Sequence, residues 1–341
     1  MNIVYLIGNG FDLNLGMKTK YEHFYEYYLT SPDDNNSFHV KKLKETIGED
    51  RENWSDLEQA LGNYLNQIKE NEAVILHDHL IEHLSKYIAL EEDKYILNDE
   101  HSNLFFNYLK KPHIGRLIPT EITEIEKYID TWRKSIWNIK IITFNYTKSI
   151  EKIMGNKAIA INNNSVNLGH NEGGYSIELT NIEHVHGFTD KRMILGVNDV
   201  TQIANNEFHE KSSIIDRYIK SECNNTYGLE HDKKCLQWIK NANLLCLFGL
   251  SFGKSDKIWW DSVGEVLRKG CKIILYEYND KKSFNANQGP HLKEAKENFK
   301  DIFFNKINIG EDLKIKIKQN IYVAYNTNMF YFDVKKKDED E

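Results

Sequence analysis

The hydrophobic residues of the chain form short, nearly continuous runs that alternate with longer amphipathic stretches. Mostly apolar runs occur at 3–7, 139–144, 243–248 and 271–276, and further strand-like runs occur at 158–161, 176–186 and 193–196. Continuous apolar runs of this length, with helices between them, are typical of strands buried on both faces of a parallel sheet. The pattern therefore predicts an α/β fold with a doubly wound, mainly parallel, Rossmann-like sheet.

Between the first two strands, the apolar positions follow helical spacing instead. After Trp54, apolar residues recur at 57, 61, 64, 65 and 68, and the segments 72–90, 102–111 and 120–138 look similar. About a hundred helical residues are too many for an ordinary crossover between strands. We therefore predict an α/β core at 1–34 and 139–330, a helical insertion or cap at 35–138 over the strand ends, and a charged, solvated tail at 331–341 that frays at its end.

Composition narrows the class of protein. The chain has 341 residues, with 44 basic and 51 acidic side chains and a net charge of −7, and 40% of its residues are hydrophobic. These values fit a folded globular protein of one large or two ordinary domains, and they oppose wholesale disorder, collagen-like repeats and coiled coils. The net acidity gives no general attraction to phosphate backbones, so nucleic acid stays open as a partner only through a local patch.

The cysteines and the N-terminus indicate a compartment. The four cysteines contain no CxxC pair, so we expect no disulfide framework. The chain begins with a strand-like run rather than a basic leader, and its apolar runs are far shorter than the ~20 residues of a membrane span. We therefore expect a cytoplasmic protein without a membrane partner.

A glycine-containing motif follows the first predicted strand, at the edge of the sheet where doubly wound folds bind ligands. Residues 8–12, with the sequence GNGFD, precede a helix, so they fit either a phosphate-binding loop or a structural tight turn. A dinucleotide fingerprint would need a third glycine where Leu13 stands. Asp12 fits either a helix cap or a carboxylate that binds a sugar hydroxyl.

Two groups of histidines carry candidate chemistry. His184 and His186 stand at the end of the 176–186 strand, where His186 before Gly187 suits a general base and a metal site is the weaker option. His79 and His83 have the i,i+4 spacing of a zinc pair but lack the HExxH order. A solvated helix face is therefore the favoured interpretation of that second pair.

Six blocks, taken in order, resemble the AbiH family of bacterial abortive-infection proteins. They are IGNGFDL at 7–13 with G-x-x-T-x-Y-x-x-F at 16–24, WSDLE at 54–58, TFNYT at 143–147, HVHG at 184–187, LGV at 195–197 and FGLSFGKSD-x-x-WW at 248–260. The resemblance covers about residues 1–280. It implies a cytoplasmic antiphage protein that stops an infected cell before the phage matures, and it supplies no reaction.

The same blocks are similar, more weakly, to the NAD-binding site of sirtuin-type (SIR2-like) proteins. In that family the asparagine of Thr-x-Asn-Tyr orients the nicotinamide ribose and the histidine of His-Gly acts as base, which implies these roles for Asn145 and His186. GNGFD departs from the usual Gly-Ala-Gly-Ile-Ser, and Thr147 stands where an aspartate is usual. Because the zinc-ribbon cysteines are missing, the resemblance implies an NAD hydrolase rather than a protein deacylase.

The predicted reaction is cleavage of the nicotinamide–ribose bond of NAD(+), which needs no cofactor or metal because NAD is the substrate. The predicted catalytic residues are His186, Asn145 and Asp12, the last to offset the growing positive charge. The predicted ligand-contacting residues are Gly8, Asn9, Gly10, Phe11, Thr143, Gly187, Gly249, Ser251 and Asp256. Among these, Asp256 fits either an adenosine ribose contact or a cap for the helix of Trp259.

Two other functions fit the same residues. A metal-dependent nuclease or other phosphoester hydrolase would use His184 and His186 with a metal and an acid such as Asp12 or Asp256. A non-catalytic nucleotide-sensing or partner-binding module would hold a ligand without turnover. Beyond NAD or a related nucleotide, the expected partners are a second copy of the chain or another protein of a defence system.

Overall fold

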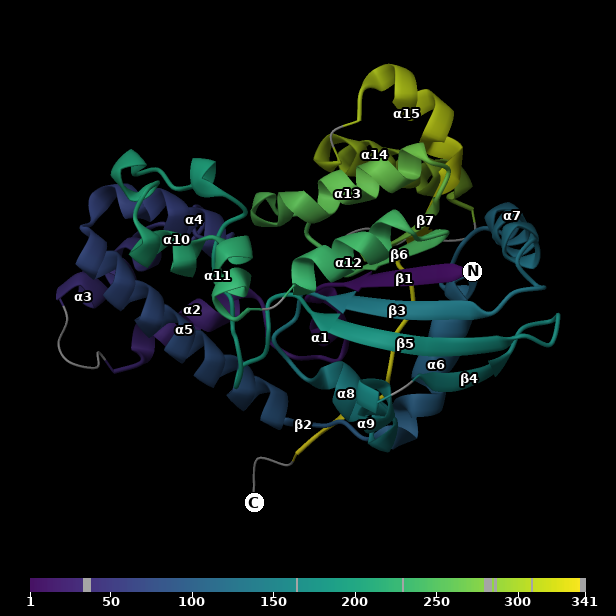
Figure 1. Ribbon diagram of the computed structural model, residues 1–341, viewed down its shortest axis with the longest axis horizontal. Coiled ribbons are helices and arrows are strands. Elements are labelled where there is room, and N and C mark those ends of the chain that lie inside the picture. Colours follow the sequence, from purple (N-terminus) through teal and green to yellow (C-terminus); the bar gives the residue numbers. More distant parts are fainter. Residues whose placement is uncertain are drawn as a thin grey trace.

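A computed structural model describes residues 1–32, 38–163, 165–228, 230–278, 284, 287–307 and 309–337. Its centre is a seven-stranded sheet in the order β4-β5-β3-β1-β6-β7-β8 (Figure 1). The strands are β1 (Asn2–Ile7), β3 (Trp137–Thr143), β4 (Val166–His170), β5 (Ser176–His184), β6 (Leu244–Phe248), β7 (Lys272–Glu277) and β8 (Ile321–Tyr325). The edge strand β4 is antiparallel to β5, and the other neighbours pair in parallel. The predicted α/β class with a mainly parallel sheet is confirmed.

The parallel strands bring four chain segments to one edge of the sheet. Across the sheet they stand third, second, first, fourth, fifth and sixth in chain order, so the order reverses between β1 and β6. Ile7 of β1 lies opposite Thr143 of β3 and Phe248 of β6, and Thr143 lies opposite His184 of β5. The residues that follow these four strands therefore gather next to the point where doubly wound sheets bind their ligands.

Helices cover both faces of the sheet (Figure 1). Alternate residues of β1 point to opposite faces, so Ile3 and Tyr5 belong to one core and Val4 and Leu6 to the other. The first core packs against α6 (Ser102–Lys110), α7 (Pro119–Asp130), α8 (Ser149–Met154) and α9 (Asn156–Asn163). The second packs against α12 (His231–Lys240), α13 (Lys257–Arg268), α14 (Gly289–Lys306) and α15 (Glu311–Ile317). The sheet is thus doubly wound.

A second body, called here the helical lobe, lies beyond the carboxyl ends of the strands, at the left of Figure 1. It comprises α2 (Tyr21–Thr30), α3 (Phe38–Glu49), α4 (Leu57–Tyr64), α5 (Glu70–Asp93) and α10 (Ser212–Tyr218). Its core also takes in Tyr146 and Leu195, from the segments after β3 and β5. Helix α11 (Lys220–Thr226) contacts both α10 and α12, so it lies between the lobe and the sheet.

The helices expected in one insertion, 35–138, divide between these two bodies. Helices α3, α4 and α5 build the core of the helical lobe, whereas Phe105 of α6 and Ile125 of α7 are fully buried in the sheet core. The helical lobe also draws on residues from beyond the insertion, such as Leu195. Packing, rather than chain order, therefore decides which helices cover the strand ends.

Two of the predicted strands are wrong. Residues 158–161 lie within α9, where Ala158 and Ile161 are three positions apart and both pack against the sheet core. A short apolar run fits either a helix or a strand, and here helical spacing prevails. Residues 193–196 form no strand within the described chain, because Met193 and Leu195 turn into the core of the helical lobe. Strand β4 lies between the predicted strands at 158–161 and 176–186, and neither β4 nor β8 was predicted.

Short elements complete the fold. Helix α1 (Gly10–Asn14) follows β1, and β2 (Tyr95–Ile96) pairs antiparallel with β9 (Lys335–Lys336). Single 3₁₀ turns are η2 (Leu65–Gln67), η3 (Asp99–His101), η4 (Pro112–Ile114), η5 (Val200–Gln202), η6 (Asn206–Phe208), η7 (Lys254–Asp256) and η8 (Lys318–Asn320). The tail expected to fray is exposed at Lys335 and Lys336 but is paired there as β9, and residues 338–341 lie outside the described residues.

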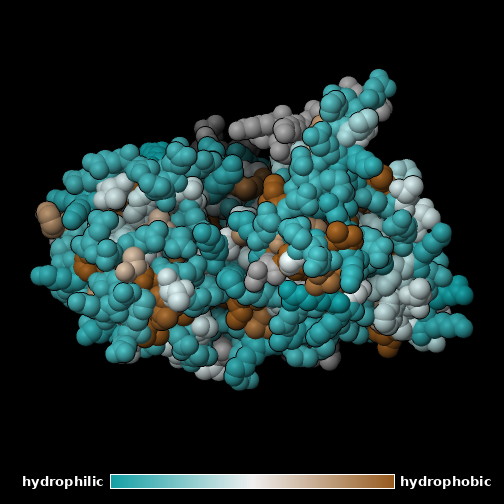
Figure 2. Space-filling model, turned by 90° about the horizontal axis from the view of Figure 1, so that it is seen from above, coloured by the Kyte–Doolittle hydropathy of each residue, from teal (hydrophilic) through white to brown (hydrophobic). Residues whose placement is uncertain are grey.

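The surface is mainly polar where it is in view. On the face shown in Figure 2, hydrophilic residues predominate and hydrophobic residues occur in small, separate groups. Among the described helices, none combines the length and apolar character needed to cross a membrane. Burial of apolar side chains is thus concentrated in the two cores at the sheet and in the core of the helical lobe.

Candidate functional site

The loops after β1 and β6 pack directly against each other where the strand order reverses. Gly8 N donates to Phe248 O and Gly10 N donates to Gly249 O, both at 2.9 Å. A Cβ atom on Gly10 would lie 2.3 Å from Gly249 Cα, and Gly249 has a φ of +65°. Close backbone contact therefore requires glycine at Gly10 and Gly249 even before any ligand is considered.

Two other predicted ligand contacts in the first loop have partners within the protein. Asn9 Nδ2 donates to Thr19 O, and Asn9 Oδ1 accepts from Thr19 Oγ1. Phe11 is fully buried in the sheet core, where it meets Phe248 and Phe330 edge to face. Asn9 therefore holds the chain after α1, and Phe11 holds α1 against the sheet.

Asp12 is a buried acid that ties α1 to the loop after β3. Its carboxylate accepts hydrogen bonds from Thr147 Oγ1 at 2.9 and 3.0 Å and from Ser149 Oγ at 2.9 Å. Burial raises the pKa of Asp12 to about 7, against the lowering effect of these hydroxyls. Asp12 is thus a positioning group for residues 145–149.

Asn145 follows β3 and presents an amide without partners. Its backbone N donates to Thr143 Oγ1 at 3.2 Å, so the buried hydroxyl of Thr143 is used within the turn. Asn145 is 6% exposed, yet neither Oδ1 nor Nδ2 of its side chain has a hydrogen-bond partner among the residues that the structure describes. A buried amide without partners costs free energy, so such a group indicates a place where water or a ligand binds.

The ring of His186 lies against the two residues that flank Asn145. The rings of Phe144 and Tyr146, on either side of the asparagine, lie 5.5 and 6.2 Å from the His186 ring between centroids. His186 is 5% exposed, and its Nε2 lies 3.1 Å from Asp256 Oδ1. A histidine in this position can accept a proton, and the carboxylate stabilises the imidazolium that forms.

His184 and Gly187, which share the HVHG block with His186, both have structural roles. His184 Nδ1 bonds Asn145 O at 3.0 Å, and His184 Nε2 bonds Glu151 Oε1 at 2.8 Å. Burial raises the pKa of Glu151, but His184 and hydrogen bonds outweigh burial and lower it overall. Gly187 has a φ of +74°, and a Cβ atom there would lie 1.7 Å from Arg192 O. His184 therefore fixes the loop of Asn145, and Gly187 is required by its turn.

Asp256 belongs to a buried chain of charges. Lys220 Nζ donates to Asp256 Oδ1 and to Glu58 Oε2, both at 2.8 Å. Lys220 begins α11 and Glu58 lies on α4, whereas Asp256 ends η7, after β6. The contacts thus run from the helical lobe to the strand ends and reach His186.

Electrostatics explain how three buried charges coexist. Burial raises the pKa of Asp256, but Lys220 and His186 outweigh burial and hold it well below its ordinary value. Burial lowers the pKa of Lys220, but Asp256 and Glu58 outweigh burial and raise it. Burial raises the pKa of Glu58, and Lys220 offsets this only in part. Asp256 and Lys220 are therefore both charged at neutral pH.

The sequence predicted no role for Glu58 or Lys220, two members of this chain of charges. Glu58 stands in the WSDLE block, so a signal for it existed, although no role was predicted. Lys220 lies in a polar, mostly helical stretch without any distinguishing pattern. Of the residues that were predicted, His186 and Asp256 come together and His186 contacts both residues that flank Asn145, whereas Ser251 stays exposed in the turn after β6.

The second pair of histidines lies in the helical lobe. The rings of His79 and His83 are 4.3 Å apart between centroids, and His79 Nδ1 contacts Tyr28 Oη at 3.0 Å. The prediction of a solvated face is wrong for His83, which is 3% exposed because it packs against the Tyr27 and Tyr28 rings. In the part of the chain that the structure describes, no three His, Cys, Asp or Glu side chains are grouped as a metal site requires.

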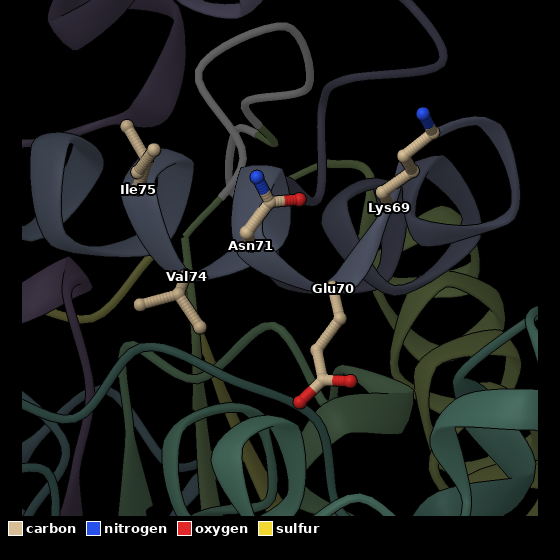
Figure 3. A pocket seen from close by; sticks show the side chains of 5 residues that line it. All are labelled: Lys69, Glu70, Asn71, Val74 and Ile75. Atoms are coloured by element: carbon tan, nitrogen blue, oxygen red, sulfur yellow. The ribbon is translucent and has the colours of Figure 1, made fainter.

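A hollow of about 590 Å³ opens elsewhere, at the start of α5. Its lining residues are Lys69, Glu70, Asn71, Val74 and Ile75 (Figure 3). Glu70 and Val74 point to one side of the helix and the other three to the opposite side, so these side chains do not converge on one ligand. The strand ends, where buried polar groups converge, are therefore the better candidate site.

Comparison with known protein families identifies the family to which this chain belongs. Residues 4–278 match a family model described as bacteriophage abortive infection AbiH. The matched span runs from β1 through β7 and contains Asn145, His186, Lys220 and Asp256. No match was found among curated proteins. The chain belongs to the AbiH family of bacteriophage abortive infection proteins.

Proposed function

We propose that this abortive infection protein hydrolyses NAD(+) at the nicotinamide–ribose bond, in the site of Asn145 and His186. One observation carries the proposal: the buried amide of Asn145 has no hydrogen-bond partner among the described residues, and the rings on either side of Asn145 contact a histidine that lies 3.1 Å from a carboxylate. The amide can hold a ribose hydroxyl and a water molecule, and His186 can take the proton of that water. Loss of NAD(+) would stop the infected cell, which is the outcome that abortive infection requires.

The proposed step balances without a further reactant. The bond from ribose C1′ to the pyridinium nitrogen breaks, and its electron pair leaves with nicotinamide, so that the ribose passes through an oxocarbenium-like state. The oxygen of one water molecule then bonds to C1′, and His186 accepts the proton that the water releases. The products are nicotinamide, ADP-ribose and one proton. The leaving group needs no proton, because the pyridinium becomes neutral nicotinamide when the bond breaks.

The charge of the site supports a cationic guest. Glu58 and Asp256 set two carboxylates against the single ammonium of Lys220, and all three side chains are at most 16% exposed. Lys220 and Asp256 balance each other's charge, so an ionised Glu58 gives the group one net negative charge, which favours a pyridinium over a phosphate. Gly8 N and Gly10 N already donate within the protein, so these glycines would offer a nucleotide close approach rather than hydrogen bonds.

Asn145 and His186 are too deeply buried for a dinucleotide to reach them without a conformational change. Asn145 and His186 are 6% and 5% exposed, and residues of the helical lobe lie over them. A dinucleotide would therefore enter only when the helical lobe moves away from the strand ends. Activity is expected to depend on an infection signal or on assembly of the protein, so the test includes infected cells.

The test compares variants of the full chain, purified and in phage-infected cells, by measuring NAD(+) and nicotinamide. We expect infection to trigger nicotinamide release with the wild type, and Asn145→Ala and His186→Ala to slow it by about 10²-fold or more. Asn103→Ala and His170→Ala are the matched controls, because both residues are exposed and distant in sequence. They should retain wild-type release.

Three other outcomes would contradict hydrolysis. Arrest of phage growth with unchanged NAD(+) would remove this reaction from the defence. Breakdown of nucleic acid that depends on added metal would instead favour the nuclease. Binding of NAD(+) measured by calorimetry, without product under any condition, would favour a sensing module.

A further inference from the structure

A single carboxylate oxygen of Asp256 faces two nitrogen bases. Lys220 Nζ lies 2.8 Å and His186 Nε2 lies 3.1 Å from the same atom, Oδ1. Lys220 Nζ also lies 2.8 Å from Glu58 Oε2. The four side chains are between 7% and 16% exposed, so solvent screens these charges only weakly.

Because they share this oxygen, Lys220 and a protonated His186 compete for the negative charge of Asp256. A protonated His186 would place a second positive charge next to the Lys220 ammonium, so Lys220 disfavours the imidazolium. Asp256 favours it because Asp256 is negative, and Glu58 favours it in its ionised form. Among the described residues, other titratable groups around His186 include Asp232 of α12, which accepts from Asn224 at 3.0 Å, and Tyr146, whose hydroxyl donates to Ile194 O.

We propose that Lys220 is a positioning residue that disfavours the imidazolium form of His186 and orients the Asp256 carboxylate that both residues share. Through Glu58, the same lysine links the proton-accepting histidine to α4 of the helical lobe. Displacement of the helical lobe therefore changes the protonation of His186 as well as access to the site. This inference deepens the proposed function and rests on it only for the rate measurement below.

The experiment follows the His186 imidazole by NMR in the isotopically labelled full chain as pH is varied. In Lys220→Met the midpoint of the His186 titration should move to higher pH by about one unit, because the competing cation is gone. In Glu58→Gln it should move to lower pH, because a favourable anion is gone. Lys220→Arg should stay near the wild type, and Lys269→Met, which removes an exposed charge, is the matched control.

Opposite shifts separate this role from simple support of the fold, which both variants would weaken alike. The acidic limb of the pH profile of nicotinamide release should move with the NMR midpoint, with about tenfold slower release per unit below it. Opposite NMR shifts without any nicotinamide release would uphold the inference and reject NAD hydrolysis. If the His186 titration shifts equally in the two variants, or does not shift, the inference about Lys220 is wrong, whatever the rate of nicotinamide release. If Lys220→Met does not fold, the other two variants test the inference. It then predicts a lower midpoint of the His186 titration in Glu58→Gln and an unchanged midpoint in Lys220→Arg.

Discussion

Asp12 combines almost complete burial with three hydrogen bonds from hydroxyl groups. Burial disfavours its charged form more than Thr147 and Ser149 favour it, so its pKa rises from 3.8 to about 7. Between these two values the folded protein holds a proton on Asp12 that the unfolded chain has released. The contribution of this group to stability is therefore largest below the lower value and falls as pH rises through the window.

We expect Asp12→Asn to gain stability relative to the wild type as pH rises through that window. The amide stays uncharged, so the variant escapes the cost of ionising a buried acid. The difference between their free energies of unfolding should change by up to about 4 kcal/mol, as measured by urea denaturation at each pH. Asp312→Asn removes an exposed carboxylate and should keep the wild-type pH dependence. Parallel curves for the wild type and Asp12→Asn would show that Asp12 is not the buried acid described.

The segment after β8 packs into the core of the sheet although it forms no helix or strand before β9. Met329, Phe330 and Phe332 are 0%, 0% and 3% exposed, although they lie between β8 and β9. The Phe330 ring packs edge to face on Tyr5 and Phe248, at the centre of the sheet. Strand β9, in contrast, has exposed side chains and pairs with the two residues of β2.

Shortened chains should separate these two parts of the C-terminal segment. A chain that ends at Val334 loses β9 and its exposed ion pair, so its free energy of unfolding should stay within about 1 kcal/mol of the wild type. A chain that ends at Asn328 also loses three buried side chains and should be destabilised by about 5 kcal/mol or more. Chemical denaturation followed by circular dichroism measures both. Equal stability of the two shortened chains would show that the aromatic residues do not anchor the segment.

Backbone contacts fix α4 to the segment that links the two bodies of the molecule. Ala204 N donates to Gly62 O at 3.1 Å, and a Cβ atom on Gly62 would lie 2.4 Å from Gln202 O. Gly62 lies on α4, whereas Gln202 belongs to the segment that links the strand ends to α10. Glycine at this position therefore lets the linking segment lie flat against the helical lobe.

Gly62→Ala should loosen the helical lobe while leaving the sheet intact. Backbone oxygen cannot yield cheaply to a new methyl group, so α4 must shift away from the linking segment. Hydrogen exchange measured by mass spectrometry should become faster in α4 and in residues 193–204, and stay slow in β1 and β6. Gly48→Ala is the control, because a Cβ there would only touch Leu29 at 4.0 Å. Faster exchange throughout the sheet would mean that the two bodies unfold as one unit.

Local pattern was sufficient to predict the strands that carry the candidate site. Buried parallel strands are continuous apolar runs, so β1, β3, β6 and β7 could be located from the residues alone, whereas β5 was indicated only by a strand-like run. Because parallel strands end at the same edge, Asn145, His186 and Asp256 could also be placed near one another. The family resemblance followed from the same strand-end blocks, and the family match over residues 4–278 confirms it.

Contacts between distant segments could not be predicted in this way. Lys220 meets Glu58 from 162 positions along the chain and Asp256 from 36, and no spacing rule connects them. The same holds for the division of the predicted insertion between the helical lobe and the sheet, and for the pairing of β8 with β7. Hydrophobic periodicity depends on neighbours along the chain and can be read from them, whereas burial and pairing of charges depend on which groups folding brings together.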